Sequence, residues 1–344
     1  MSTGNSPAGS LVLPWKMKII ITLLNVFSDT VRNSDGTINR RLVNFFEPKV
    51  PANATPFKGV KTSDITVDAN RNLWFRLFTP TEIPSGVTLP VILFFHGGGF
   101  SLLSADGKAY DFVCRRFALK LPAVVVSVNY RLSPEHRFPS HYDDGFDTLK
   151  FLDESEPEKL GFPANADLSR CFLAGDSAGG NLAHHVAIRS GKADFKKVRV
   201  IGQISIQPFF GGEKATESEI RLVNAPIISS ARTDWMWKVF LPEGENRDHE
   251  AVNVSGPRAV DIRGVQYPET MVVVGGFDPL QDRQREFYEW LKRSGKETKL
   301  VEYPNGIHAF YVFPELPESS LFFGEAMDFV RKVCEKEYGS SARM

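Results

Sequence analysis

The stretch Gly175-Asp176-Ser177-Ala178-Gly179 decides the fold of this chain. It follows an apolar run, residues 171–174, and opens a helical stretch, residues 178–189, so the pattern Gly-x-Ser-x-Gly falls on a predicted strand-to-helix turn. Such a turn holds the serine in a strained conformation with its hydroxyl exposed, and the flanking glycines let strand and helix approach closely. The helix N-terminus favours developing negative charge. We therefore predict that Ser177 is a nucleophile.

Apolar runs alternate with helical stretches through most of the chain. Many of these runs are continuously apolar, which is typical of strands covered on both faces in a parallel sheet. Residues 63–68 and 73–78 predict two earlier strands joined by a polar turn. Further strands are predicted at residues 91–95, 123–128, 171–174, 200–206, 270–274 and 299–302, and helices at 141–152, 178–189, 280–294 and 317–337. The predicted fold class is α/β, with a mostly parallel central sheet flanked by helices.

His96-Gly97-Gly98-Gly99 follows the predicted strand at residues 91–95. An acyl-transfer enzyme must stabilise the oxyanion of its tetrahedral intermediate, and N–H groups of glycines leave an open approach for it. We predict the donors to be Gly97, Gly98 and Ala178. A flexible loop is the alternative, which the serine motif downstream disfavours. A phosphate site is disfavoured because no Gly-Lys-Ser/Thr follows.

Two loops after predicted strands carry an acid and a histidine, Asp278 and His308. With Ser177, they stand in the chain order of the α/β-hydrolase fold. His308 would accept the serine proton and pass it to the leaving alcohol, while Asp278 would fix the imidazole tautomer and stabilise the imidazolium. Asp282 and Glu302 remain alternative acids.

The composition describes an ordinary globular protein without a charged partner. The 344 residues are 42% apolar and 24% charged, and 41 basic residues balance 41 acidic ones. This balance suggests neither nucleic acid nor an anionic membrane as a partner. We expect a small-molecule ester as the substrate, no cofactor, no metal, and a monomer.

The cysteines and the N-terminal apolar run indicate a cytoplasmic location. The three cysteines are widely spaced and form no Cys-x-x-Cys pair, which predicts reduced thiols and no structural zinc. The apolar run at residues 17–27 is shorter than the roughly 20 residues of a membrane span. The residues that follow it make a poor signal-peptide cleavage site.

The N-terminal segment is too apolar to be a plain solvated tail. We predict a tail and helical lid at residues 1–60, then a hydrolase domain at 61–338 with a cap-like insertion at about 209–263. The lid should cover the open carboxyl edge of the sheet above Ser177. A membrane-surface anchor is the alternative. The residues of this segment that we expect to be buried are Leu11, Leu13, Trp15, Ile19, Leu23, Leu24, Val26 and Phe27.

Several motifs together carry a family resemblance. They are His-Gly-Gly-Gly at 96–99, Asn-Tyr-Arg-Leu-Ser-Pro-Glu-His at 129–136, Gly-Asp-Ser-Ala-Gly-Gly-Asn at 175–181, Asp-Pro-Leu at 278–280, and Asp-Gly-Thr-Ile-Asn-Arg at 35–40. From about residue 11 to 333 the chain resembles the plant branch of the hormone-sensitive-lipase-like carboxylesterases, which includes the gibberellin receptors. The resemblance implies an α/β-hydrolase fold and hydrolysis of small-molecule carboxylic esters through a Ser-His-Asp triad and an acyl-enzyme.

Two other activities occur among proteins that this chain resembles. The gibberellin receptors lack the triad histidine, whereas this chain has His308. Hydroxyisoflavanone dehydratases can carry threonine at the nucleophile position, whereas this chain has Ser177. Both residues favour an esterase. A hormone receptor without turnover and a dehydratase or cyclase remain the alternatives.

Overall fold

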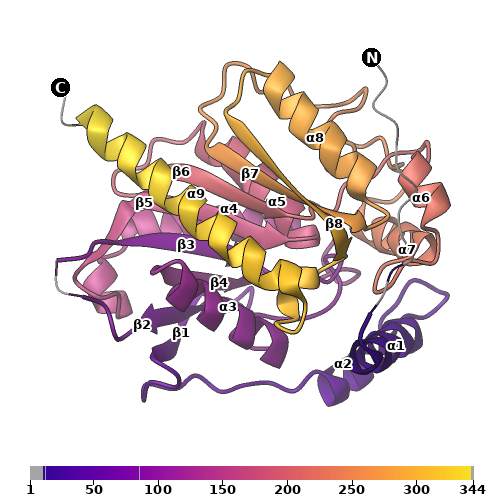
Figure 1. Ribbon diagram of the computed structural model, residues 1–344, viewed down its shortest axis with the longest axis horizontal. Coiled ribbons are helices and arrows are strands. Elements are labelled where there is room, and N and C mark those ends of the chain that lie inside the picture. Colours follow the sequence, from indigo (N-terminus) through magenta and orange to yellow (C-terminus); the bar gives the residue numbers. More distant parts are fainter. Residues whose placement is uncertain (1–10, 12, 85, 342–344) are drawn as a thin grey trace.

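The computed structural model describes residues 11, 13–84 and 86–341, so residues 1–10 and 12 of the expected tail lie outside the described part. An eight-stranded sheet forms its centre, in the order β1-β2-β4-β3-β5-β6-β7-β8 (Figure 1). β2 pairs antiparallel with β1 and β4, and all other neighbours are parallel, which confirms the mostly parallel sheet. The strands are β1 Val60–Asp68, β2 Leu73–Pro80, β3 Leu89–Phe95, β4 Val124–Asn129, β5 Ala166–Asp176, β6 Val200–Ile206, β7 Glu269–Phe277 and β8 Thr298–Ile307.

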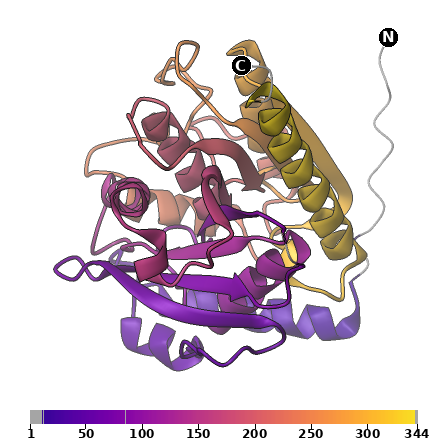
Figure 2. The same cartoon turned by 90° about the vertical axis from the view of Figure 1, so that its left-hand side faces the viewer.

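Helices cover both faces of the sheet. Along the fully buried β3, Leu93 packs in one apolar cluster with residues of α4 and α5, and Ile92 packs in another with residues of α3 and α9. Because neighbouring strand residues point to opposite faces, both sides of the strand must be apolar. Figure 2 shows α9 running along one side of the twisted sheet. The helices are α1 Trp15–Val31, α2 Arg40–Phe46, α3 Lys108–Lys120, α4 Ser140–Glu154, α5 Ala178–Ser190, α6 Glu217–Arg221, α7 Ser230–Phe240, α8 Gln281–Arg293 and α9 Pro317–Ser341.

The helix predicted for the N-terminal lid is present as α1, and side-chain hydrogen bonds join it to α7. Arg232 of α7 donates to both carboxylate oxygens of Asp29 in α1, at 2.9 and 2.7 Å, and to the side chain of Asn25 at 2.8 Å. Figure 1 shows α1, α2, α6 and α7 gathered at one end of the sheet. The ion pair between Arg232 and Asp29 therefore holds α1 against the long connection between β6 and β7.

The burial predicted for the lid is wrong for part of its apolar set. Trp15, Ile19, Leu23, Leu24 and Val26 are 41–68% exposed. Apolar residues cover most of the circumference of helix α1, but only one stripe of the helix faces the protein. That stripe includes the buried Met17 and Ile21. Of the described helices, none combines the length and apolar character needed to cross a membrane.

Candidate active site

Ser177 occupies a sharp turn between β5 and α5, as the glycine-flanked motif predicts. Its backbone has φ +52° and ψ −118°, a conformation that costs free energy for a residue with a Cβ. The turn is held because the Ser177 N–H donates to the carbonyl of Ile206 at 2.9 Å. A Cβ on Gly179 would lie 1.9 Å from the carbonyl oxygen of Phe95, so only glycine fits there. The turn is thus packed against the strands on both sides of β5.

Asp278 and His308 form a buried pair, each at the end of a strand. His308 Nδ1 lies 2.8 Å from Asp278 Oδ2 and donates a hydrogen bond to it. In the neutral imidazole, Nε2 is then the nitrogen that can accept a proton. Asp278 is fully buried, and the same Oδ2 accepts hydrogen bonds at 2.9 Å from the amides of Gln207 and Gln284. The N–H of Leu280 donates to Oδ1 at 2.9 Å. These donors orient the carboxylate and stabilise its charge.

The alternative acids lie in other interactions. Asp282 accepts the N–H of Ser218 at 2.8 Å, and Glu302 pairs with Arg285 at 2.7 Å. His308 contacts Asp278 instead. The structure therefore favours Asp278 as its acid partner.

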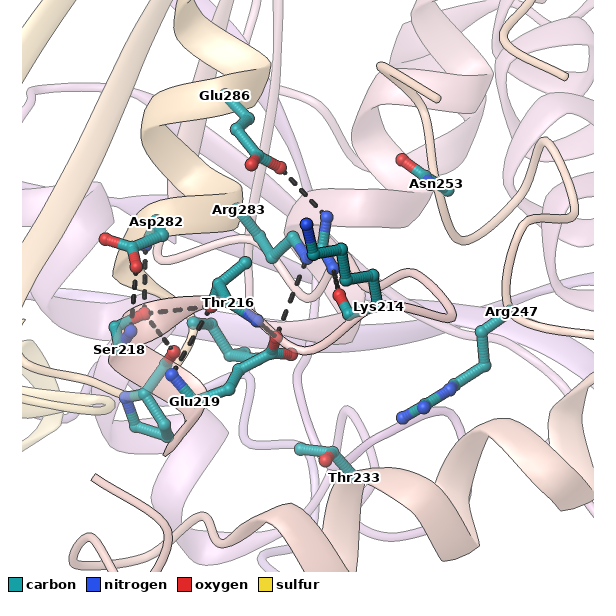
Figure 3. Close-up of polar contacts among 12 residues, drawn as sticks. Lys214, Thr216, Ser218, Glu219, Thr233, Arg247, Asn253, Asp282, Arg283 and Glu286 are labelled. Atoms are coloured by element: carbon teal, nitrogen blue, oxygen red, sulfur yellow. Dashed lines mark hydrogen bonds and ion pairs between the residues drawn. The ribbon is translucent and has the colours of Figure 1, made fainter. Parts of the chain in front are cut away.

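Helix α6 is joined to the start of α8, directly after Asp278 in the chain (Figure 3). The Ser218 hydroxyl donates to the carbonyl of Pro279 at 2.7 Å, in addition to the contact with Asp282. Arg283 donates to the carbonyl of Lys214. These hydrogen bonds therefore connect the segment between β6 and β7 to the loop that carries Asp278.

Two carboxylates raise the basicity of His308. Burial lowers the pKa of its imidazole, but the charge and hydrogen bond of Asp278, together with the charge of Asp176, outweigh burial, so the pKa of His308 is raised above 6.5. Burial also raises the pKa of Asp176 to about 6, although the Tyr110 hydroxyl opposes this by donating to it. His308 is therefore placed to gain a proton readily.

The structure corrects the predicted oxyanion site at Gly97. Its N–H donates to the Tyr110 hydroxyl at 2.6 Å, and the residue does not line the cavity above Ser177. Gly98 and Gly99 do line that cavity, with φ +101° and +60°, and their N–H groups donate to no backbone carbonyl of the described chain. Gly99, which is not among the predicted donors, therefore joins Gly98 as a candidate oxyanion donor.

A largely apolar cavity of about 200 Å³ lies over these groups. Ser177 and His308 both line it, whereas Ala178, which begins α5 directly after Ser177, does not. No lysine or arginine is among its described lining residues. Within the same described part, no group of three His, Cys, Asp or Glu side chains is placed to hold a metal. Apolar walls come from Leu24, Phe27, Leu102, Ile228, Met236 and Phe313.

Comparisons with known proteins agree with this fold. A family model described as the alpha/beta hydrolase fold matches residues 92–312. The chain is 39% identical over 336 residues to the gibberellin receptor GID1C of Arabidopsis thaliana, covering 94% of this chain and 96% of that one. It is 37% identical over 292 residues to carboxylesterase 20 of the same plant, covering 82% and 88%.

Solved structures show the same architecture. The hyperthermophilic esterase from the archaeon Pyrobaculum calidifontis superposes with a TM-score of 0.71 at 26% identity, covering 92% of this chain and 98% of that one. A bacterial heroin esterase superposes with a TM-score of 0.68 at 27% identity, covering 81% and 86%. The chain therefore belongs to the alpha/beta-hydrolase family that contains the plant carboxylesterases and the gibberellin receptors.

Proposed function

We propose that this protein hydrolyses small, apolar carboxylic esters through an acyl-enzyme on Ser177. The observation that carries the proposal is one apolar cavity lined by both Ser177 and His308, with His308 bonded to Asp278. At about 200 Å³, the cavity is below the range of about 300–1,000 Å³ for drug-sized ligands, which favours a short acyl group.

The chemistry follows from the roles of these side chains. His308 Nε2 takes the proton as Ser177 Oγ attacks the ester carbonyl, and the N–H groups of Gly98, Gly99 and Ala178 bind the oxyanion. The imidazolium gives that proton to the departing alcohol, leaving an acyl-enzyme. A water then attacks the acyl carbon, with its proton passing through His308 to Ser177.

We expect the purified protein to hydrolyse p-nitrophenyl acetate and butyrate. Its kcat/KM should fall on acidification, because protonated His308 cannot act as a base. Since the pKa of His308 is raised, the midpoint of this loss should lie above 6.5 in the free enzyme. Measurement of kcat/KM across pH, with and without a chelator, tests this. Inactivation by the chelator with rescue by zinc would contradict the mechanism.

The lid should influence the choice of acyl chain. Phe27 of α1 lines the cavity, whereas Leu23 on the same helix is 64% exposed. Replacing Phe27 by alanine should reduce kcat/KM for the butyrate ester, relative to the acetate, by roughly fourfold, because a buried methylene contributes about 0.8 kcal/mol. Leu23→Ala is the matched control and should keep the wild-type ratio. Identical ratios in all three proteins would exclude this role for the lid.

Gibberellin binding is the second candidate function. It is favoured by the receptor relatives, one of which matches 94% of this chain, and by the apolar cavity, which Leu24 and Phe27 of α1 help to line. Calorimetry with a gibberellin separates the two candidates. An esterase should bind it weakly or not at all and turn over model esters. Tight binding without hydrolysis of any ester tested would favour the receptor.

A further inference from the structure

The turn that follows β6 contacts all three loops of the proposed catalytic site. The Ile206 carbonyl accepts the Ser177 N–H at 2.9 Å, and the Phe209 N–H donates to the Ser177 carbonyl at 2.8 Å. Between them, the N–H of Gln207 donates to the carbonyl of Val273 in β7 at 2.9 Å. The turn is therefore fixed to the nucleophile on one side and to the strand that leads to Asp278 on the other.

The Gln207 side chain extends this contact to the acid and the histidine loop. Its Nε2 donates to Asp278 Oδ2 at 2.9 Å and to the carbonyl of Ile307 at 3.1 Å. Its Oε1 accepts the N–H of Ala309 at 2.8 Å. The amide thus binds the residues immediately before and after His308 and also its carboxylate partner, while the side chain itself is 1% exposed.

The backbone around Gln207 is arranged to make room for this side chain. Gln207 has φ +44°, a left-handed conformation that is uncommon for a residue with a Cβ. A Cβ on Gly275 would lie 2.6 Å from Gln207 Nε2, so the glycine allows the amide to pass β7. The strained backbone of Gln207 and the missing side chain of Gly275 together indicate that the fold requires the amide to lie at this position.

We propose that Gln207 is a positioning residue that fixes the Asp278–His308 pair relative to Ser177, an inference that rests on the proposed ester hydrolysis. Gln207 does not line the cavity, so it acts through the pair and not on the substrate. Its donor keeps Asp278 oriented as a carboxylate, and its acceptor holds the histidine loop. A displacement of about 1 Å in such a site costs on the order of a hundredfold in rate.

Gln284 shows why Gln207 is the informative residue. Gln284 Nε2 also donates to Asp278 Oδ2, but its Oε1 has no partner in the described part of the chain. Gln284 therefore supports the carboxylate alone, whereas Gln207 joins the carboxylate to both sides of His308.

The first test compares Gln207→Met with Gln203→Met. Gln203 is a matched control because it is a fully buried glutamine of β6 whose amide bonds to Ser205 and Tyr267. Both variants lose buried hydrogen bonds and should be less stable. Only Gln207→Met should lose kcat, by on the order of a hundredfold, with KM changed much less. Circular dichroism confirms that both variants are folded at the assay temperature.

The second test is Gln207→Glu, which remains informative if the methionine variant fails to fold. A protonated carboxyl can donate to Asp278 and accept from Ala309, as the amide does, although its single O–H leaves the carbonyl of Ile307 without this donor. Its ionisation places two carboxylates side by side and removes the donor, which is strongly unfavourable. We expect kcat of Gln207→Glu to approach the wild type at the acidic end of the active range and to fall on the alkaline side, where the wild type is constant. Gln203→Glu should keep the wild-type profile.

A readout without substrate separates this inference from the proposed function. The His308 imidazole resonances, assigned by their loss in His308→Gln, should titrate at a different pH in Gln207→Met. Wild-type kcat, pH profile and imidazole titration in the Gln207 variants would overturn the inference. If the wild type hydrolyses no ester, the proposed function fails, while the titration still supports or overturns the positioning role.

Discussion

Replacing Ser177 by alanine is expected to lower kcat for a p-nitrophenyl ester by about 10⁴- to 10⁶-fold, because triad members act as a unit and the residual rate comes from binding and oxyanion stabilisation. The fold should survive. The strained turn is held by the backbone of residue 177, whose N–H and carbonyl bind Ile206 and Phe209. Its Oγ makes no hydrogen bond to the described part of the chain, so the substitution leaves no buried partner unsatisfied.

The measurement is steady-state hydrolysis by wild type and variant, with the thermal unfolding midpoint of each. Ser205→Ala is a suitable control because Ser205 is a buried serine of the neighbouring strand β6, bonded to Gln203. It should keep nearly full activity. A Ser177→Ala protein with a tenth or more of the wild-type activity would refute Ser177 as the nucleophile.

Replacing Asp278 by asparagine should lower kcat by about 10⁴-fold. In the wild type, Oδ2 accepts from His308, Gln207 and Gln284, and Oδ1 accepts the N–H of Leu280. An asparagine NH₂ group must therefore face a donor whichever way the amide is turned. If it faces His308, the imidazole must carry its proton on Nε2 and cannot accept one from Ser177.

The matched controls are Asp282→Asn and Glu302→Gln, the acids that contact Ser218 and Arg285. We expect both to keep activity within a few-fold of the wild type, with any loss appearing in thermal stability. If Asp282→Asn or Glu302→Gln loses activity as Asp278→Asn does, the choice of Asp278 as the acid is wrong.

The sequence analysis did not predict helix α3 or the exposed face of α1. Helix α3 was not predicted, yet its buried Tyr110, Val113, Cys114 and Phe117 follow the spacing of an amphipathic helix, so its signal was present. Helix α1 was predicted, but its exposed residues were not. An apolar composition does not say which stripe of a helix meets the protein, because that depends on which elements lie opposite.

The sequence by itself determined the features that are set within a few residues. The continuous apolar strands and the strand-to-helix turn at Ser177 are of this kind, because strand patterning and glycine sterics act locally. The chain order of Ser177, Asp278 and His308 is likewise read directly from the sequence.

Only the tertiary structure decided which groups meet. Asp278 is the carboxylate bonded to His308, 30 positions away, and the Gln207 amide bonds to Asp278 and to Ala309, which lie 71 and 102 positions away from it. Tyr110 occupies the N–H of Gly97, so the free donors are shifted to Gly98 and Gly99. No local pattern encodes such contacts, because each depends on how loops distant in the sequence pack at one edge of the sheet. A buried donor there bonds to whichever acceptor the packing brings close to it.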